Sequence, residues 1–325
     1  MTYRAYFLKF TTPLHLSDYK PDSYESSEDV LRSDTIIAAI MAAWAKQGHE
    51  EWIGDGDLPF TVSSAFPYYQ KENKEVVMFM PRPKLPFNNA DSDIGISKEA
   101  KKVKWIEKDL FEDVIKGNSI SLNSVLQGDY LSVQKVEADF MYKQVSERVT
   151  IPRDRTSEDS RPFYMERIYF NHGGLYFLAT GDYLERIDKA LSLLQYEGIG
   201  TDRNVGNGFF EFTSTDITLD GARDSEYSMA LGLYCPLNKE QLSSELDAKS
   251  AYELVKRGGY ITKEGYQTIE KCSIYMMAEG SILKTNKPIH GKSSIDLTPK
   301  DLPQDMRPNH SIYRCGRTIF IPVKV

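Results

Sequence analysis

The order of strand-like and helix-like segments in the first two thirds of the chain is the feature that most constrains the fold. The stretch 3–10, YRAYFLKF, is rich in aromatic residues and places Tyr6, Leu8 and Phe10 on one face, which is typical of a β-strand. Apolar residues then recur at helical spacing over 33–49. We therefore expect a strand, a polar loop and a helix, with short strands after it at 60–66 and 75–80.

Strand-like and helix-like segments return in the middle of the chain. Two strand-like runs, 165–170 and 174–180, are joined by the turn sequence Asn-His-Gly-Gly, which predicts a hairpin. A helix is predicted over 182–197, and a strand follows over 209–219. The full order is strand, helix, strand, strand, helix, strand, which is the ferredoxin-like arrangement.

Both helices carry residue types that commonly stand at helix ends. Ser33 or Asp34 can cap the first helix. Asp182 and Glu185 have the spacing of a capping box at the start of the second helix, and Gly198 is expected to end it.

The rest of the chain divides into an insertion and a second block. Residues 81–145 contain runs of proline, asparagine and lysine that break the pattern, so we expect a surface insertion within a domain spanning 1–218. Residues 219–325 again mix strands with a helix, in which we expect a degenerate second copy of the same unit. The predicted fold is α+β, with two ferredoxin-like, RRM-related domains of βαββαβ order.

Charge and composition narrow the function. A net charge of −7 and a pI near 5.4 argue against a free-standing nucleic-acid binder, so a polyanion would need local geometry or a larger assembly. No apolar run approaches ~18 residues, and no signal peptide precedes the first strand, so we expect a cytoplasmic protein without a membrane anchor. Cys235, Cys272 and Cys315 form no CxxC and are expected to be buried thiols rather than metal ligands.

Four glycines fall between residues 198 and 208, around Arg203 and Asn204. A dinucleotide-binding loop must follow a strand and open a helix, whereas this loop follows a helix. The glycines either form a tight turn at the end of the helix or expose backbone N–H groups to an anion. The residues alone leave both readings open.

Four arginines fall between residues 148 and 161, directly before Phe163 and Tyr164. Basic side chains beside aromatic ones suit single-stranded nucleic acid, where phosphates meet the charges and bases stack on the rings. Because four acidic residues nearly cancel the arginines, a solvated loop is the alternative.

Several segments together resemble one family. The glycine-rich stretch GIGTDRNVGNGFFEF follows an amphipathic helix and resembles the signature loop of the RAMP superfamily of CRISPR proteins. Three further parts of the chain resemble one family within it, the Csm subunit four family. They are FLKFTTPLHLSD with LRSDTIIAAI, then RVTIPRDRTSEDSRPFYMERIYF, and finally AEGSIL, GKSSIDL and YRCGRTIFIPVKV near the end. The closely similar subunit of type III-B complexes remains open as an alternative on this one sequence.

This resemblance implies a non-catalytic subunit of a type III-A CRISPR effector complex, without metal or cofactor, that grips the 5′ repeat-derived handle of the crRNA. It also implies two protein partners, the large polymerase-like subunit and the adjacent backbone RAMP subunit, in a hetero-oligomeric complex. Such an assembly would supply the positive field that the chain lacks. The RNA-binding residues expected on this basis are His15, Arg32, Ser33, Arg148, Arg153, Arg155, Arg161, Phe163, Tyr164, Gly198, Gly200, Thr201, Arg203, Asn204, Gly206 and Gly208.

Two other functions remain open at this point. His15 could serve as general acid or base in a metal-independent CRISPR repeat endoribonuclease, although no titratable partner is close to it in sequence. The chain could also be a docking subunit whose glycine loop contacts protein rather than RNA. At the first helix, Arg32 and Ser33 either face a phosphate or serve only the helix end.

Overall fold

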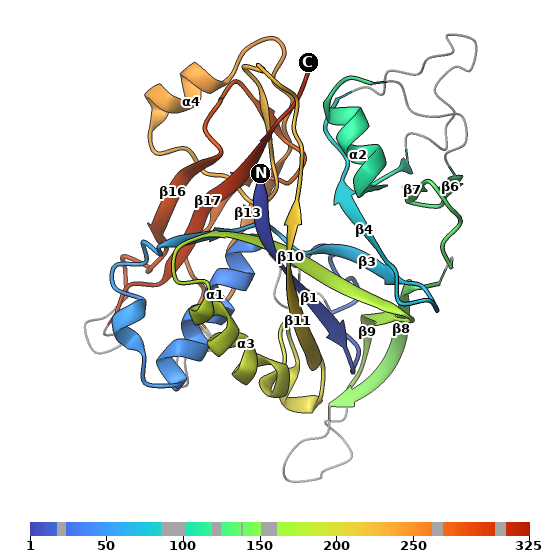
Figure 1. The fold of residues 1–325 in the computed structure, drawn as a ribbon. Helices are drawn as coiled ribbons and strands as arrows, with labels where there is room; N and C mark the ends of the chain where they lie inside the picture. The colour runs from blue at the N-terminus through green and yellow to red at the C-terminus, as the bar shows by residue number, and fades with distance from the viewer. Residues whose placement is uncertain are drawn as a thin grey trace.

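The computed structural model describes residues 1–17, 24–85, 102–118, 125–137, 139–150, 161–261, 269–302 and 310–325. The fold is mixed α+β (Figure 1). The described residues form four α-helices: α1 (Ser33–Lys46), α2 (Lys108–Ile115), α3 (Glu185–Glu197) and α4 (Lys239–Glu245). Two single turns of 3-10 helix are η1 (Glu50–Trp52) and η4 (Arg203–Val205).

The largest sheet has nine strands in the order β11-β1-β10-β3-β4-β5-β7-β6, and β2 also pairs with β10. All neighbouring strands are antiparallel except β5 and β7. Its strands are β1 (Thr2–Phe10), β2 (Phe60–Val62), β3 (Phe66–Gln70), β4 (Val76–Pro81), β5 (Trp105–Glu107), β6 (Val125–Gln127), β7 (Tyr130–Ser132), β10 (Gly173–Gly181) and β11 (Phe210–Thr218). The first and last predicted strands of the N-terminal unit are confirmed as β1 and β11, which pair along their full length.

The helices α1 and α3 pack against each other on one face of this sheet (Figure 1). Tyr6, Leu8 and Phe10 of β1 point into the core beneath them, as the alternation predicts. Tyr3 and Ala5 point to the opposite face, where they pack in a second core with residues of the C-terminal block. The sheet is therefore covered on both faces, which explains the apolar character of its central strands.

The predicted cap of α1 is wrong. Its capping residue is Arg32, which makes no side-chain capping hydrogen bond. The hydroxyl of Ser33 instead accepts a hydrogen bond from the N–H of Leu233 at 3.0 Å, and Asp34 is paired with Arg257. Both candidate side chains therefore contact the C-terminal block and do not cap the helix.

The predicted capping box of α3 is also wrong. The residue before the helix is Leu184, and no side chain caps it. Tyr183 stands in the left-handed region with φ of 57°, so the chain turns sharply between Asp182 and Glu185. The predicted end at Gly198 is confirmed, because its N–H donates to the last turn of the helix.

The predicted hairpin between 165–170 and 174–180 is wrong. Strand β9 (Arg161–Phe170) pairs with β8 (Met141–Thr150) in a separate two-stranded ribbon, whereas β10 enters the main sheet between β1 and β3. Gly173 and Gly174 lie so close to neighbouring strand carbonyls that any side chain there would overlap them. The two glycines therefore lie where the chain enters the main sheet as β10. The β8–β9 ribbon projects from that sheet (Figure 1).

The segment 81–145 adds to the main sheet. It contributes β5, β7 and β6 to one edge, and α2 packs against β4 and β5. Trp105, Ile106 and Phe111 are buried in the same core as β3 and β4. This part of the chain is thus more than a surface loop.

The C-terminal block forms a four-stranded sheet of order β15-β12-β17-β16. Its strands are β12 (Ser228–Ala230), β15 (Ile282–Leu283), β16 (Ile289–Asp296) and β17 (Tyr313–Pro322), and a separate pair consists of β13 (Leu254–Arg257) and β14 (Ile274–Met277). The strands and the helix α4 expected in this block are present. Strand β17 also packs against α1, which joins the block to the N-terminal unit.

The three cysteines are all free. Cys235 is buried and Cys315 is half-buried, but Cys272 is exposed, so the prediction of three buried thiols is wrong for Cys272. Its position just before β14 places it outside the small core to which Cys235 belongs. Among the residues that the structure describes, no helix combines the length and the apolar character needed to cross a membrane.

Candidate nucleic-acid interface

The glycine loop, residues 198–208, runs from the end of α3 to β11 and lies against the segment that follows β1. A side chain at Gly200 would come within 2.5 Å of the carbonyl oxygen of His15, and one at Gly208 would overlap the carbonyl of Ile199. Gly198 has φ of 79° and is similarly packed against the returning chain. Close approach of the protein's own backbone therefore explains three of the four glycines.

The tip of the loop has a different character. Gly206 has φ of 88°, with no atom within 4 Å of the place where a side chain would start. Asp202 is also left-handed, with φ of 56°, and the single turn η4 lies between the two. The tip is thus a tight turn that projects from the body rather than a cradle lined on all sides.

Arg203 and Asn204 occupy this tip. Arg203 is half-buried, Asn204 is exposed, and neither side chain forms a hydrogen bond or ion pair with any residue that the structure describes. Within the same residues, the backbone N–H groups of Arg203 and Asn204 likewise have no acceptor, whereas those of Val205 and Gly206 donate within the turn. The tip therefore presents one guanidinium, one amide and free backbone donors, which suit a phosphate or the edge of a base.

The arginine-rich ribbon lies beside the glycine loop. The guanidinium of Arg148, on β8, is 3.5 Å from the carboxylate of Asp202. Tyr164, on β9, is 54% exposed, and Phe163 beside it is half-buried. Arg153 and Arg155 lie outside the described residues, as does the side chain of Arg161, whose backbone begins β9. The tertiary fold therefore brings together two segments that the sequence analysis singled out separately.

An aromatic stack connects the ribbon to the start of the chain. The ring of Phe163 lies 5.6 Å from that of Tyr24, which in turn stacks on His15 at 6.0 Å. Tyr24 was missed by the sequence analysis, because a single tyrosine after a polar stretch carries no periodic signal. The stack fixes the ribbon against the segment after β1, which contacts the glycine loop.

His15 is fully buried. Its Nδ1 lies 2.7 Å from the carbonyl oxygen of Glu166, so Nδ1 carries the proton and donates it. Burial lowers the pKa of His15, which favours the neutral ring, and Nε2 has no hydrogen-bond partner among the residues that the structure describes. A buried neutral histidine held by a backbone carbonyl has the features of a structural residue more than those of a general acid or base.

Comparison with known proteins identifies what the chain is similar to. Residues 223–323 match the family model described as the CRISPR Csm4 C-terminal domain. Two curated relatives, each described as CRISPR system Cms protein Csm4, are 23% identical to the chain. The protein from Methanocaldococcus jannaschii matches over 92% of both chains, and the protein from Streptococcus thermophilus over 100% of both. Residues 223–323 thus carry the features of a Csm4 C-terminal domain, and the chain as a whole is similar to curated Csm4 proteins. The resemblance found in the sequence is thereby confirmed.

Solved structures share the fold of this chain. A chain in the crystal structure of the Csm3–Csm4 subcomplex of the type III-A CRISPR-Cas interference complex superposes with a TM-score of 0.65 at 18% identity, over 100% of both chains. A chain in the crystal structure of the Csm1–Csm4 cassette in complex with cA4 gives 0.59 at 19% identity, over 100% of this chain and 99% of the other.

Two further residues of the glycine loop lie against the body of the fold. The N–H of Thr201 donates to the carbonyl of His15 at 3.0 Å, so Thr201 holds the loop against the segment that follows β1. Asn207 is only 1% exposed, and its Nδ2 has no partner within the described residues. The sequence analysis passed over Asn207, although its position between two glycines was the available signal.

Arg32 and Ser33 are engaged within the protein rather than offered at this interface. Arg32 pairs with Glu28 at 3.0 Å and also with Glu279 of the C-terminal block. Ser33 is 3% exposed. The charges of the two carboxylates outweigh the effect of burial and raise the pKa of Arg32. Both residues belong to the contact between the N-terminal unit and the C-terminal block.

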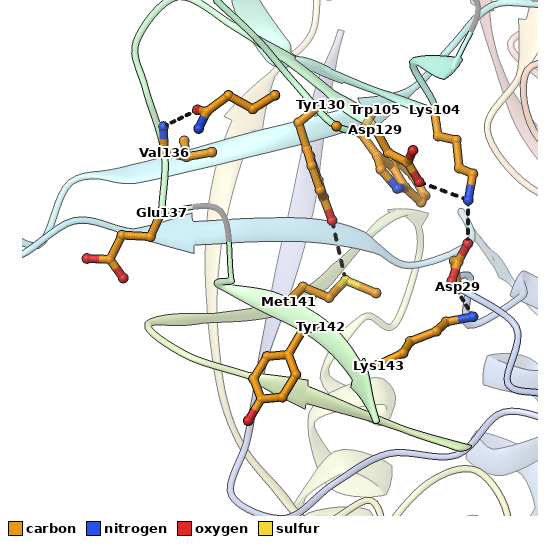
Figure 2. A pocket seen from close by; sticks show the side chains of 12 residues that line it. Asp29, Lys104, Trp105, Asp129, Tyr130, Val136, Glu137, Met141, Tyr142 and Lys143 are labelled. Carbon is orange, nitrogen blue, oxygen red and sulfur yellow. Dashed lines mark hydrogen bonds and ion pairs between the residues drawn. The ribbon is translucent and has the colours of Figure 1, made fainter. Parts of the chain in front are cut away.

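A cavity of about 600 Å³ lies at the base of the ribbon (Figure 2). In its wall, the carboxylate of Asp29 lies between Lys104 at 2.9 Å and Lys143 at 2.7 Å. Lys104 also pairs with Asp129, so the lysines here already have anionic partners. The cluster anchors β8 to the main sheet, and we assign no ligand to it. Within the described residues, no group of three or more metal-binding side chains is found.

Proposed function

We propose that this chain is a non-catalytic subunit of a type III-A CRISPR effector complex that caps the 5′ repeat-derived handle of the crRNA. The proposal rests mainly on one observation, the contact between Arg148 and Asp202 that sets the ribbon beside the glycine loop. The same two segments contain Arg203, whose side chain has no partner among the described residues, the exposed Asn204 and the exposed Tyr164. Cationic groups for the phosphates and exposed aromatic rings for the bases are what a single RNA strand requires.

The topology supports two ferredoxin-like domains, 1–218 and 219–325. In the first, the strand order β11-β1-β10-β3 with α1 and α3 on one face is that of a βαββαβ unit, in which the first strand lies between the third and fourth. The segment 81–145 then extends the edge beyond β3. For the second, support comes from the separate sheet of residues 228–322 and from the family match to the same region.

The partners proposed are the large polymerase-like subunit and the adjacent backbone subunit. Support comes from the structural neighbours, which occur in a Csm1–Csm4 cassette and in a Csm3–Csm4 subcomplex. The net charge of −7 agrees with this role, because a chain that holds RNA through a few local cations depends on its assembly for the remaining positive field.

The endoribonuclease alternative has less support. A general acid or base must come within hydrogen-bond reach of the reacting proton, and His15 is fully buried against Glu166 and Tyr24. A pure docking role would place a protein surface on the loop tip, whereas a guanidinium beside free backbone N–H groups is the arrangement that suits a phosphate. We therefore favour RNA binding at the tip.

The test compares Arg203→Ala with Arg223→Ala. Arg223 is an exposed arginine of the C-terminal block, without an ion pair among the described residues, so its replacement removes the same charge elsewhere. Loss of a charged phosphate contact at Arg203 should weaken binding of the repeat-derived 5′ RNA about tenfold. It should also reduce the slope of log affinity against log salt by about 0.7.

Ultraviolet crosslinking of the co-expressed complex supplies the second readout. We expect crosslinks from the 5′ end of the crRNA to peptides containing 198–208 or 141–170. Intact complexes with crosslinks only to other subunits, and equal affinities for the two arginine variants, would assign the loop to protein docking. Cleavage of repeat RNA in EDTA that is lost in His15→Ala would establish the endoribonuclease instead.

A further inference from the structure

A carboxylate stands in the middle of the proposed RNA surface. Asp202 is the residue that pairs with Arg148, and it directly precedes Arg203 at the loop tip. A fixed negative charge at this place repels any phosphate that approaches the two arginines. Its presence needs an explanation, because a surface selected only for affinity would not contain it.

The backbone does not require this carboxylate. Asp202 has φ of 56° and ψ of 33°, a left-handed conformation that aspartate and asparagine both tolerate. The hydrogen bonds that shape the loop tip do not depend on the carboxylate either, since the backbone carbonyl of Asp202 accepts from the N–H of Val205. The charge itself is therefore the property to explain.

The ion pair between Asp202 and Arg148 is open to exchange. Their side chains are 28% and 27% exposed and their charged atoms are 3.5 Å apart, so water and an incoming phosphate can reach both. Pairs of this kind contribute little to stability and are readily replaced. A buried pair, such as the one that Asp34 forms with Arg257, could not be opened in this way.

We propose that Asp202 occupies the place of an RNA phosphate on Arg148 and acts as a specificity-determining residue. The inference rests on the proposed function. An RNA strand that contacts the site only through phosphates must displace Asp202 and gains little. The 5′ handle makes further contacts with the loop tip and the ribbon, and these offset the lost pair. Asp202 thereby lowers the affinity for unrelated RNA more than the affinity for the handle.

The test uses Asp202→Asn in the full-length chain, purified alone and in its complex. Asparagine keeps the left-handed backbone and removes only the charge. The matched control is Glu147→Gln, because Glu147 precedes Arg148 on the same strand, is exposed, and has no ion-pair partner within the described residues. Affinities for oligouridine and for the repeat-derived 5′ RNA are measured at three salt concentrations, and thermal unfolding checks that each variant folds.

Asp202→Asn should bind oligouridine about fivefold more tightly at low salt, as expected for removal of one charge near 4 Å in water. The gain should be smaller for the 5′ RNA, smaller at high salt, and smaller in Glu147→Gln. Equal gains in the two variants, or weaker binding of both RNAs by Asp202→Asn, would overturn the inference and make Asp202 a simple tether. Failure of the unmodified protein to bind either RNA would overturn the proposed function as well.

Discussion

The carboxylate of Asp34, at the start of α1, accepts hydrogen bonds of 2.9 and 3.2 Å from the guanidinium of Arg257, on β13. Arg314 of β17 also pairs with Asp34, and all three side chains are largely buried. The beginning of α1 is therefore where the N-terminal unit and the C-terminal block are held together. A buried charge with two charged partners is costly to leave unpaired, which makes this contact a sensitive test of the structure.

Replacement of Asp34 by asparagine should destabilise the chain strongly. The change leaves two buried guanidinium groups without their carboxylate, and the free energy of unfolding should fall by about 3–5 kcal/mol. The control is Asp216→Asn, which removes a carboxylate 2.5 Å from Arg4 in a pair whose side chains are 34% and 61% exposed. That variant should lose less than about 1 kcal/mol. Equal losses in urea unfolding would show that the Asp34 cluster does not join the two parts.

The contribution of Asp34 should depend on pH. Burial by itself would raise the pKa of Asp34, but the charges and hydrogen bonds of Arg257 and Arg314 outweigh it and lower the pKa well below its usual range. Because the folded-state pKa is below the unfolded-state value, the stabilisation is complete above about pH 4 and decreases as the pH falls further. Urea unfolding of the unmodified chain and Asp34→Asn should thus converge between about pH 4 and pH 2. A constant difference over that range would contradict the assignment.

Alanine at two glycines of the loop should have different effects. Gly206 has φ of 88° and open space around it, so Gly206→Ala should cost about 1–2 kcal/mol from backbone strain alone. Gly208 has a similar φ of 76°, but a methyl group there would also overlap the carbonyl of Ile199. Thermal unfolding should show a clearly larger loss for Gly208→Ala. Similar melting temperatures would mean that the loop does not pack as the structure has it.

One thiol should react quickly in the native protein. Cys272 is exposed, whereas burial raises the pKa of Cys235 and raises that of Cys315 to about 11. A thiol reagent needs both access and the thiolate, so titration with Ellman's reagent near pH 8 should show one fast thiol before denaturation and three afterwards. Cys272→Ser should remove the fast phase. A fast phase that persists in this variant would indicate that another cysteine is accessible.

The parts of the fold that depend on local periodicity could be predicted. The aromatic alternation of β1, the apolar stripe of α1 and the glycine that ends α3 are each contained in a few consecutive residues. The capping residues and the hairpin before β10 were wrong for a common reason. Ser33, Asp34 and β10 each have several possible partners, and the nearest one in sequence is not the one that packs against them.

For the candidate site, too, the local features could be predicted and the long-range contacts could not. The sequence marked the glycine loop and the arginine segment as separate features, because each has a distinctive local composition. Their proximity, through Arg148 and Asp202, and the contribution of Tyr24 were not predictable, since no local pattern records which loops meet in space.

By itself, the sequence determined the order of strands and helices, the end of α3 and the resemblance to the Csm4 family, because these follow from residue patterns over short stretches. Only the tertiary structure decided that three loop glycines serve the protein's own backbone, that His15 is buried, and that Asp34 links the two parts of the chain. The physical reason is that burial and ion pairing depend on groups distant in sequence, whose positions are set only when the sheets pack.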